Sequence, residues 1–189
     1  MKKYKRICII GYKCTGKSYV ANLLGDKLGW KVYHMDKVIQ REEDKSLKVL
    51  TKNGTNWTYF RNKEYEKLKT LLQEDEVIID CNEGVPVNEV NMNDEFKLLV
   101  NSKSTLKVWV RANKVIMANK FRRKLEKIKR TKRITKEELY KYLKVEYATM
   151  DKYNDIYENL ADVVVKFSEF TDITKVLSML NIQVISVNN

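Results

Sequence analysis

The sequence contains little proline, cysteine and histidine, and it has no long hydrophobic run. Among 189 residues there are one proline, three cysteines and one histidine. Three cysteines without metal-ligand spacing argue against a disulfide framework and against a structural zinc site. No apolar stretch approaches the ~20 residues needed to span a bilayer. The apolar segment 7–10 behind the basic N-terminus is too short for the core of a signal peptide. We therefore expect a cytoplasmic protein without a membrane partner.

Positive charge is in excess, with 37 lysines and arginines against 25 aspartates and glutamates and a formal net charge of +12. Such an excess favours anionic partners, ATP among them. The sequence lacks a recognisable nucleic-acid-binding motif, so nucleic acid is not the expected partner. Hydrophobic residues make up 43% and charged residues 33%, which is typical of a globular protein. Without repeats or an evident linker, the sequence predicts one domain over residues 1–189. It does not specify an oligomeric state.

Short apolar runs alternate with longer segments of helical periodicity, a pattern typical of an α/β protein with a parallel sheet. The runs are rich in isoleucine and valine and do not alternate with polar residues, which suits strands covered on both faces. We expect five strands, at 6–10, 31–34, 76–80, 106–110 and 162–165. The predicted helices are 17–28, 59–73, 94–100, 114–129, 135–160 and 171–180, and residues 183–187 form a candidate edge strand. Thr135 and Glu138 have capping-box spacing, which marks a helix start.

The strongest motif is the segment 11–18, GYKCTGKS, which matches the P-loop pattern G-x-x-x-x-G-K-[ST]. It follows a predicted strand and precedes a predicted helix. Gly11 and Gly16 let the backbone curl so that successive N–H groups point at phosphate oxygens. Lys17 would reach the β- and γ-phosphates, and the hydroxyl of Ser18 would ligate Mg²⁺. We expect the nucleotide to be bound by Gly11, Lys13, Cys14, Thr15, Gly16, Lys17, Ser18 and Tyr19.

Two aspartates follow predicted strands. Asp80 ends the apolar run 77–80 and is the candidate for holding Mg²⁺; the alternative is an aspartate that caps a helix or a turn. Asp36 follows the second strand, at the edge of the sheet where ligands bind. Its carboxylate could accept the proton of an attacking hydroxyl, or it could equally cap the next helix. A lone histidine such as His34 is more often a packed or surface residue than a base.

Arg61 lies early in a predicted amphipathic helix on the far side of the cleft. Arginine forms bidentate pairs with carboxylates and phosphates, so Arg61 is a candidate for binding an anionic acceptor. The alternative is an exposed helix arginine without a specific role.

Over about residues 6–165 the chain resembles the shikimate kinases, a branch of the nucleoside-monophosphate-kinase-like P-loop enzymes. The phosphate-loop motif with residues 28–32 looks like the first unit of that family. Asp36 matches the second aspartate of its D-x-D motif, which implies contact with the acceptor hydroxyls and the role of base. Residues 60–64 match its F-R-x-x-E motif, residues 107–110 its fourth strand and residues 157–162 its Y-x-E-x-A-D ending. The resemblance implies a P-loop NTPase fold in which helices sandwich the sheet, and it gives Arg61 the role of gripping the acceptor carboxylate.

The chain departs from the family pattern at four places. His34 replaces the first aspartate of D-x-D, which the family associates with Mg²⁺. Only Gly84 remains of the three-glycine motif that follows the third strand. Tyr153 stands where the family has a second carboxylate-binding arginine, and the R-P-L-L signature of the lid is absent. The resemblance therefore predicts the family scaffold with an altered acceptor pocket, in which Asp36, Arg61 and Gly84 contact the acceptor.

A dense basic run extends from Lys120 to Arg133 and contains only one acidic residue, Glu126. In kinases of this class the corresponding segment is a helical lid that closes over ATP. We expect a lid at about residues 121–135, with Arg123 in a catalytic role and with Arg130 and Arg133 on the nucleotide. The alternative for each of these arginines is a solvated helix face.

The sequence thus predicts an enzyme that transfers the γ-phosphoryl group of ATP to a small molecule, with ATP and Mg²⁺ as cofactors. The leading hypothesis is a shikimate-kinase-like enzyme with a diverged acceptor pocket. The alternative is a nucleoside monophosphate kinase or a dephospho-coenzyme-A-type kinase. A third hypothesis, from another class, is an ATP-binding regulatory or RNA-associated protein with little turnover.

Overall fold

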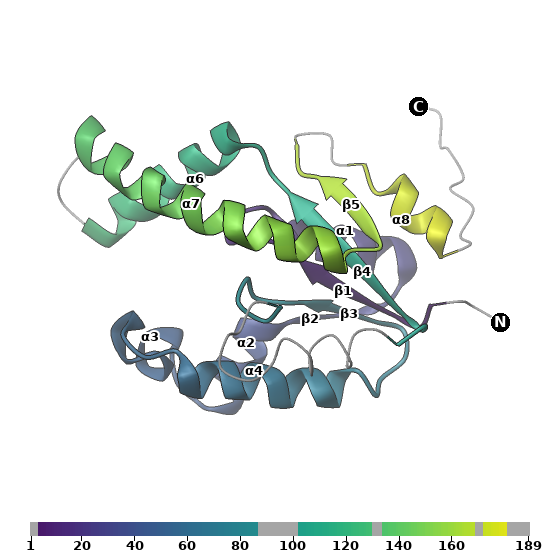
Figure 1. Ribbon diagram of the computed structural model, residues 1–189. Helices are drawn as coiled ribbons and strands as arrows, with labels where there is room; N and C mark the ends of the chain where they lie inside the picture. Colours follow the sequence, from purple (N-terminus) through teal and green to yellow (C-terminus); the bar gives the residue numbers. More distant parts are fainter. Residues whose placement is uncertain (1–3, 87–101, 130–133, 169–171, 181–189) are drawn as a thin grey trace.

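The computed structural model describes residues 4–86, 102–129, 134–168 and 172–180. Its centre is a five-stranded sheet with the order β2-β3-β1-β4-β5, and all neighbouring strands are parallel. The strands are β1 (Arg6–Ile10), β2 (Lys31–His34), β3 (Val77–Asp80), β4 (Thr105–Arg111) and β5 (Val163–Lys166). The predicted five-stranded parallel sheet is therefore confirmed (Figure 1).

The strand residues divide between two hydrophobic cores, one on each face of the sheet. Ile7 and Ile9 of β1 belong to one core, and Cys8 and Ile10 belong to the other. All four are at most 1% exposed. Both faces are covered because the connections between parallel strands pass over them. The edge strand β5 differs from the prediction, since its buried and exposed residues alternate and Val164 is 41% exposed.

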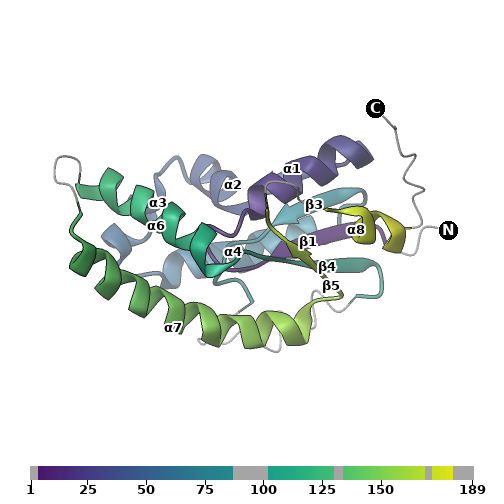
Figure 2. The ribbon, with the colours of Figure 1, turned by 90° about the horizontal axis from the view of Figure 1, so that it is seen from above.

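Helices α1 (Lys17–Leu28) and α8 (Thr174–Met179) pack on the first face. Helix α1 begins directly after the predicted phosphate loop, and Val20, Ala21 and Leu24 face the sheet with no exposed surface. It ends at Gly29, which has a left-handed φ of 67° and is the usual kind of residue after a helix end. Seen from above, α1 and the long helix α7 (Lys136–Leu160) lie on opposite sides of the sheet (Figure 2).

The second face carries a larger set of helices. These are α2 (Met35–Glu42), α3 (Leu47–Leu50), α4 (Thr58–Leu71), α6 (Lys114–Lys129) and α7, together with a 3₁₀ turn at Lys52–Gly54. Trp109 of β4 and Tyr157 of α7 are among the largest fully enclosed side chains of this core. The predicted capping box is confirmed, because the Thr135 side chain accepts from Glu138 N–H and Glu138 in turn accepts from Thr135 N–H.

Helices α2 and α3 were not among the ranges expected from the sequence. Only eight and four residues long, they are shorter than the window of about 11–18 residues over which helical periodicity is recognised in a sequence. The predicted helix 94–100 and the predicted edge strand 183–187 lie outside the described residues.

The cysteines are free, with Cys8 and Cys81 buried in the sheet. In the described ranges, no helix is both long and apolar enough to cross a membrane.

Leu24→Ala should destabilise the protein by about 2–5 kcal/mol, because it removes methyl groups from a fully buried site on α1 and leaves a cavity. Its neighbour Leu23 is only partly buried on the same helix, so Leu23→Ala is a control of the same chemistry. Urea denaturation followed by circular dichroism would measure both. Equal losses for the two variants would contradict the packing of α1 on the sheet.

Candidate functional site

The segment between β1 and α1 has the curled backbone expected of a phosphate loop, which we define as residues 11–18. Gly11 and Gly16 have φ values of 141° and 100°, and Cys14 is left-handed at 64°. A Cβ atom on Gly11 would lie 2.5 Å from the carbonyl oxygen of Val110, and one on Gly16 would overlap the ring of Phe167. Both positions therefore require glycine, for conformation and for space.

The carbonyl oxygen of Tyr12 is the point at which the loop is tied together. It accepts hydrogen bonds from Thr15 Oγ1 at 2.8 Å and from Lys17 Nζ at 3.1 Å. Thr15 and Lys17 are 3% and 9% exposed, so little water competes for these bonds. The lysine that the sequence assigns to the phosphates is thus held across the loop by the loop's own backbone.

Ser18 and Asp80, the two residues predicted to hold Mg²⁺, are brought together. Ser18 Oγ donates to Asp80 Oδ2 at 2.7 Å, and the aspartate is 6% exposed. His34 and Asp80 are register partners on β2 and β3, and His34 Nδ1 lies 2.8 Å from the same oxygen. Oxygen donors of this kind suit Mg²⁺, which prefers a few protein oxygens completed by phosphates and water. A histidine bonded to a metal-binding carboxylate would orient that carboxylate.

Within the described part of the chain, no group of three histidine, cysteine, aspartate or glutamate side chains is arranged to hold a metal ion. Ser18 and Asp80 supply two oxygen donors, and Mg²⁺ held by so few protein oxygens usually takes further ones from substrate phosphates and water.

Asp36 lies in the first turn of α2, immediately after β2. Its Oδ1 accepts from the backbone N–H of Lys37 at 2.8 Å, which leaves the second carboxylate oxygen for another partner. The side chain is half-buried, while the next residues inward, Met35 and Ile39, are in the core. The N-cap residue of α2 is His34, so Asp36 is not the capping residue that one reading expected, although its negative charge in the first turn is favourable at a helix N-terminus. The role of base stays a prediction.

Arg61 is placed by a buried carboxylate. Its Nη1 donates to Glu64 Oε2 at 2.5 Å, and Asn82 donates to the other oxygen of Glu64, which is 1% exposed. Burial raises the pKa of Glu64, and the bonds from Arg61 and Asn82 oppose that rise. A Cβ atom on Gly84 would overlap the guanidinium group of Arg61. The structure therefore brings Arg61 and Gly84 into contact, and the guanidinium already has one anionic partner.

Tyrosines fill the space beside the phosphate loop where the family pattern has an arginine. The ring of Tyr153 packs edge-on against Tyr12 at 5.6 Å between centroids and against Tyr157 at 6.3 Å. The hydroxyl of Tyr157 donates to the carbonyl oxygen of Glu83 at 2.7 Å, next to Gly84. The wall formed by the rings of Tyr12, Tyr153 and Tyr157 is aromatic and uncharged.

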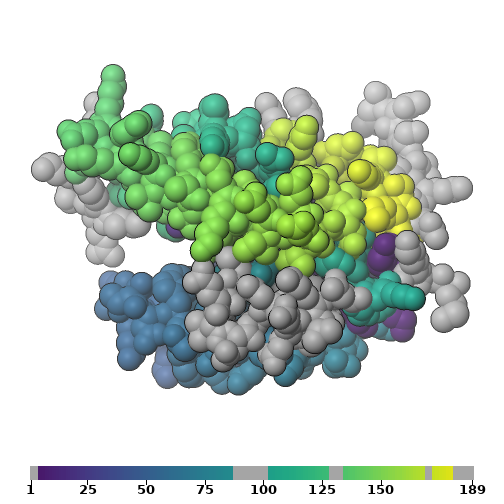
Figure 3. All heavy atoms as spheres, in the orientation of Figure 1, coloured from purple at the N-terminus to yellow at the C-terminus, as the bar shows by residue number. Residues whose placement is uncertain are grey.

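Helices α6 and α7 form a hairpin at the predicted lid position. In the space-filling view, a hollow separates this hairpin from the α3–α4 region (Figure 3). Arg123 is exposed on α6, and Arg130 and Arg133 lie outside the described residues. The α6 cation that approaches the loop is Lys120, a residue the sequence did not single out. Its Nζ lies 4.0 Å from the ring centre of Phe167, the ring that faces Gly16 and also contacts Tyr19.

Glu146 of α7 was also not predicted, although it contacts two residues of the phosphate loop. Its two carboxylate oxygens accept from Tyr12 Oη and from Lys13 Nζ, each at 2.7 Å. The x positions of a P-loop motif carry no expectation of side-chain contacts, and Glu146 is more than 130 residues away in sequence. Only a contact map could have revealed this pairing.

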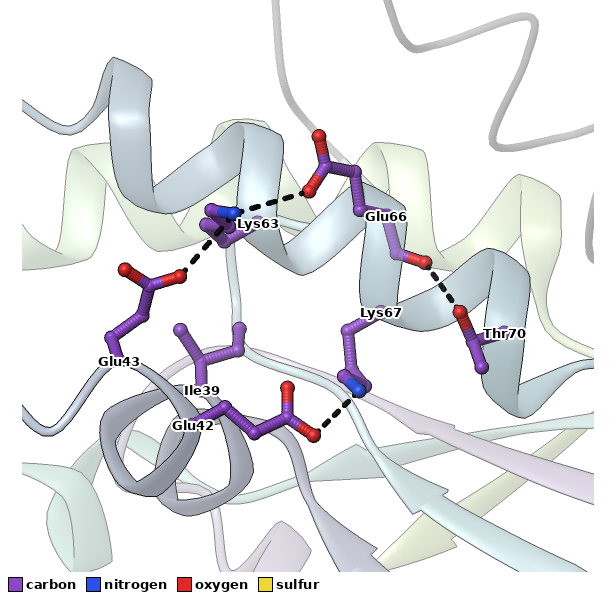
Figure 4. A pocket seen from close by; sticks show the side chains of 7 residues that line it. All are labelled: Ile39, Glu42, Glu43, Lys63, Glu66, Lys67 and Thr70. Carbon is purple, nitrogen blue, oxygen red and sulfur yellow. Dashed lines mark hydrogen bonds and ion pairs between the residues drawn. The ribbon is translucent and has the colours of Figure 1, made fainter.

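Charges in the pocket between α2 and α4 are already paired within the protein. Lys67 bonds to Glu42 at 2.6 Å, and Lys63 lies 3.3 Å from Glu43 and 3.5 Å from Glu66 (Figure 4). The pairs with Glu42 and Glu43 join α4 to α2 and its C-cap residue, whereas Lys63–Glu66 lies within α4. We therefore locate the candidate site at the phosphate loop and the ends of β2 and β3.

Known shikimate kinases are similar to this chain in sequence. The family model described as "Shikimate kinase" matches residues 13–181. A shikimate kinase of Aquifex aeolicus is 37% identical over 89 residues, which cover 47% of this chain and 52% of that protein. One of Chlorobium phaeobacteroides is 27% identical over 146 residues, covering 75% and 69% of the two chains. The chain thus spans about half the length of the first of these curated relatives.

Solved structures show the same fold. The shikimate kinase of Aquifex aeolicus aligns with a TM-score of 0.60 at 26% identity and covers 85% of both chains. One from Acinetobacter baumannii, in complex with shikimate, has a TM-score of 0.69 at 14% identity over 89% of this chain and 86% of that one. With the family model matching most of its length, this chain belongs to the shikimate kinase family.

Proposed function

We propose that the protein is an ATP-dependent kinase that transfers the γ-phosphoryl group to a hydroxyl of a small molecule, as a shikimate-kinase-like enzyme with a diverged acceptor pocket. The observation that carries this proposal is the meeting of Ser18 and Asp80 at 2.7 Å where the phosphate loop enters α1. The three cysteines are free thiols, which suits a reducing compartment, and ATP is available in the cytoplasm. We therefore propose that the protein acts in the cytoplasm.

On the nucleotide side, the backbone N–H groups of residues 11–19 would cradle the phosphates, and the N-terminus of α1 adds a favourable dipole. Lys17 would bond to the β- and γ-phosphate oxygens, and its ammonium group has three donors, so it can keep its bond to the Tyr12 carbonyl. Ser18 would ligate Mg²⁺ directly and Asp80 through a coordinated water. The bound metal would neutralise the charge that develops on the transferred group.

On the acceptor side, Asp36 would take the proton of the attacking acceptor hydroxyl while the oxygen of that hydroxyl bonds to the γ-phosphorus. The bond from that phosphorus to the β–γ bridging oxygen breaks, and ADP leaves. Arg61 would bind an anionic group of the acceptor from the opposite side of the crevice, and Gly84 keeps space for its guanidinium. With Tyr153 in the position of the second arginine, acceptor recognition rests on one guanidinium, already shared with Glu64.

The α6–α7 hairpin would act as the lid. Closure over ATP excludes water and places cations near the transferring group. Arg123, Arg130 and Arg133 remain the proposed cations of this step. Lys120 joins them because it already lies on the loop side of α6, against Phe167.

A panel of acceptors tests the proposal: shikimate, nucleosides, nucleoside monophosphates and dephospho-coenzyme A, with ADP formation followed by a coupled assay. We expect a hydroxylated small acid to raise ADP release and Lys17→Ala to abolish that rise without changing the circular dichroism spectrum. Release raised only by a nucleoside monophosphate or by dephospho-coenzyme A would replace the proposed acceptor class. ATP binding without turnover for any acceptor would favour a regulatory protein.

Asp36→Asn tests the role of base. The asparagine carbonyl oxygen can still accept from the Lys37 N–H, but the side chain does not accept a proton at neutral pH. We expect a fall in kcat of about 10²–10⁴-fold, the usual range for general base catalysis, with ATP affinity nearly unchanged. An unchanged kcat would rule out Asp36 as the base.

Gly84→Ala should push the Arg61 guanidinium off Glu64, because the new Cβ occupies the same space. Losing hydrogen bonds to a buried charged group would lower the free energy of unfolding by about 1.5–3 kcal/mol and raise KM for the acceptor. In an Arg61→Ala background the space is vacant, so Gly84→Ala should then cost little. Equal costs in both backgrounds, measured by chemical denaturation, would refute the contact.

A further inference from the structure

The proposed mechanism gives no role to the buried carboxylate of Glu146. It lies on α7 with 7% of its surface exposed, and its partners Tyr12 and Lys13 occupy two x positions of the phosphate loop. Burial alone would raise the pKa of Glu146, but the hydrogen bonds from Lys13 and Tyr12 outweigh it and lower that pKa. The carboxylate is therefore ionised and paired at neutral pH.

Tyr12 connects this carboxylate with the lysine of the loop. Its hydroxyl donates to Glu146 Oε2, and its own carbonyl oxygen receives Lys17 Nζ and Thr15 Oγ1. The ring between these two ends is 3% exposed, with Phe121 of α6 edge-on at 6.5 Å and Tyr153 of α7 at 5.6 Å. A residue fixed at its hydroxyl and around its ring has little freedom to move its carbonyl.

We propose that Glu146 is a positioning residue for the phosphate loop. Glu146 holds Tyr12, and the carbonyl oxygen of Tyr12 in turn positions Lys17. This inference rests on the proposed binding of ATP at the loop. Helix α7 would then contribute to ATP affinity without touching the phosphates. A loop that is already held in its binding conformation loses less conformational entropy when ATP binds.

The simpler reading is that Glu146 only braces α7 against the sheet. The two readings differ in one measurable property. A brace supports the fold whichever residue is at position 17, whereas a positioning residue affects ATP affinity only while Lys17 is present to be positioned.

The test measures the Kd of ATP·Mg²⁺ by isothermal titration calorimetry for the wild type, Glu146→Met, Tyr12→Phe and the double variant. We expect each single variant to weaken binding by about 5–10-fold, the size of one to two net hydrogen bonds. Because both changes break the same link, the double variant should bind no more than about twofold worse than Glu146→Met.

In a Lys17→Ala background, Glu146→Met should change Kd by less than about twofold. Glu42→Met is the control of the same chemistry: it breaks an ion pair of similar length between α2 and α4 that involves no residue of the phosphate loop, and it should leave Kd unchanged (Figure 4). If Glu146→Met fails to fold because the Tyr12 hydroxyl is left buried without a partner, the double variant, which removes that hydroxyl, takes its place.

A folded Glu146→Met or double variant that binds ATP like the wild type would overturn the inference and leave the proposed function intact. Equal weakening with and without Lys17 would reduce Glu146 to a brace. Failure of the wild type itself to bind ATP would instead remove the proposed function, and this inference with it.

Discussion

The backbone between β1 and α1 has to turn through left-handed conformations at Gly11, Cys14 and Gly16, and the arrangement of the site depends on that turn. The curl returns Lys17 across the loop to the Tyr12 carbonyl. It also sets Ser18 beside Asp80, at the end of the neighbouring strand. Non-glycine side chains at the two glycine positions would overlap Val110 or Phe167.

Around this loop, the acceptor side of the site differs most from the family pattern. The family arginine that remains, Arg61, is paired with a glutamate that is 1% exposed, so part of its charge is already compensated inside the protein. Tyr153 adds an aromatic edge instead of a second cation. An acceptor bound at the proposed site would therefore be selected by shape and by a single polar anchor more than by net charge.

Several parts of the fold followed directly from the sequence. The five expected strands begin and end within one residue of the observed ones, and runs rich in isoleucine and valine marked β1, β3 and β5 most clearly, because buried parallel strands are rich in these residues. The capping box at Thr135 gave the start of α7. Helices α2 and α3 were missed because they are short, and the alternating burial of β5 was missed because its place at the sheet edge is a property of topology.

The sequence by itself determined the phosphate loop, because that function depends on backbone conformation and on contiguous residues: glycines at two fixed positions and Lys17-Ser18 at the helix start. Only the tertiary structure decided which distant side chains meet at the loop. Three sets of side-chain contacts join segments that lie far apart in the chain: Glu146 with Tyr12 and Lys13, His34 with Asp80, and Lys120 with Phe167. Such pairings arise from the order of strands and the packing of helices, and no local pattern of residues encodes them.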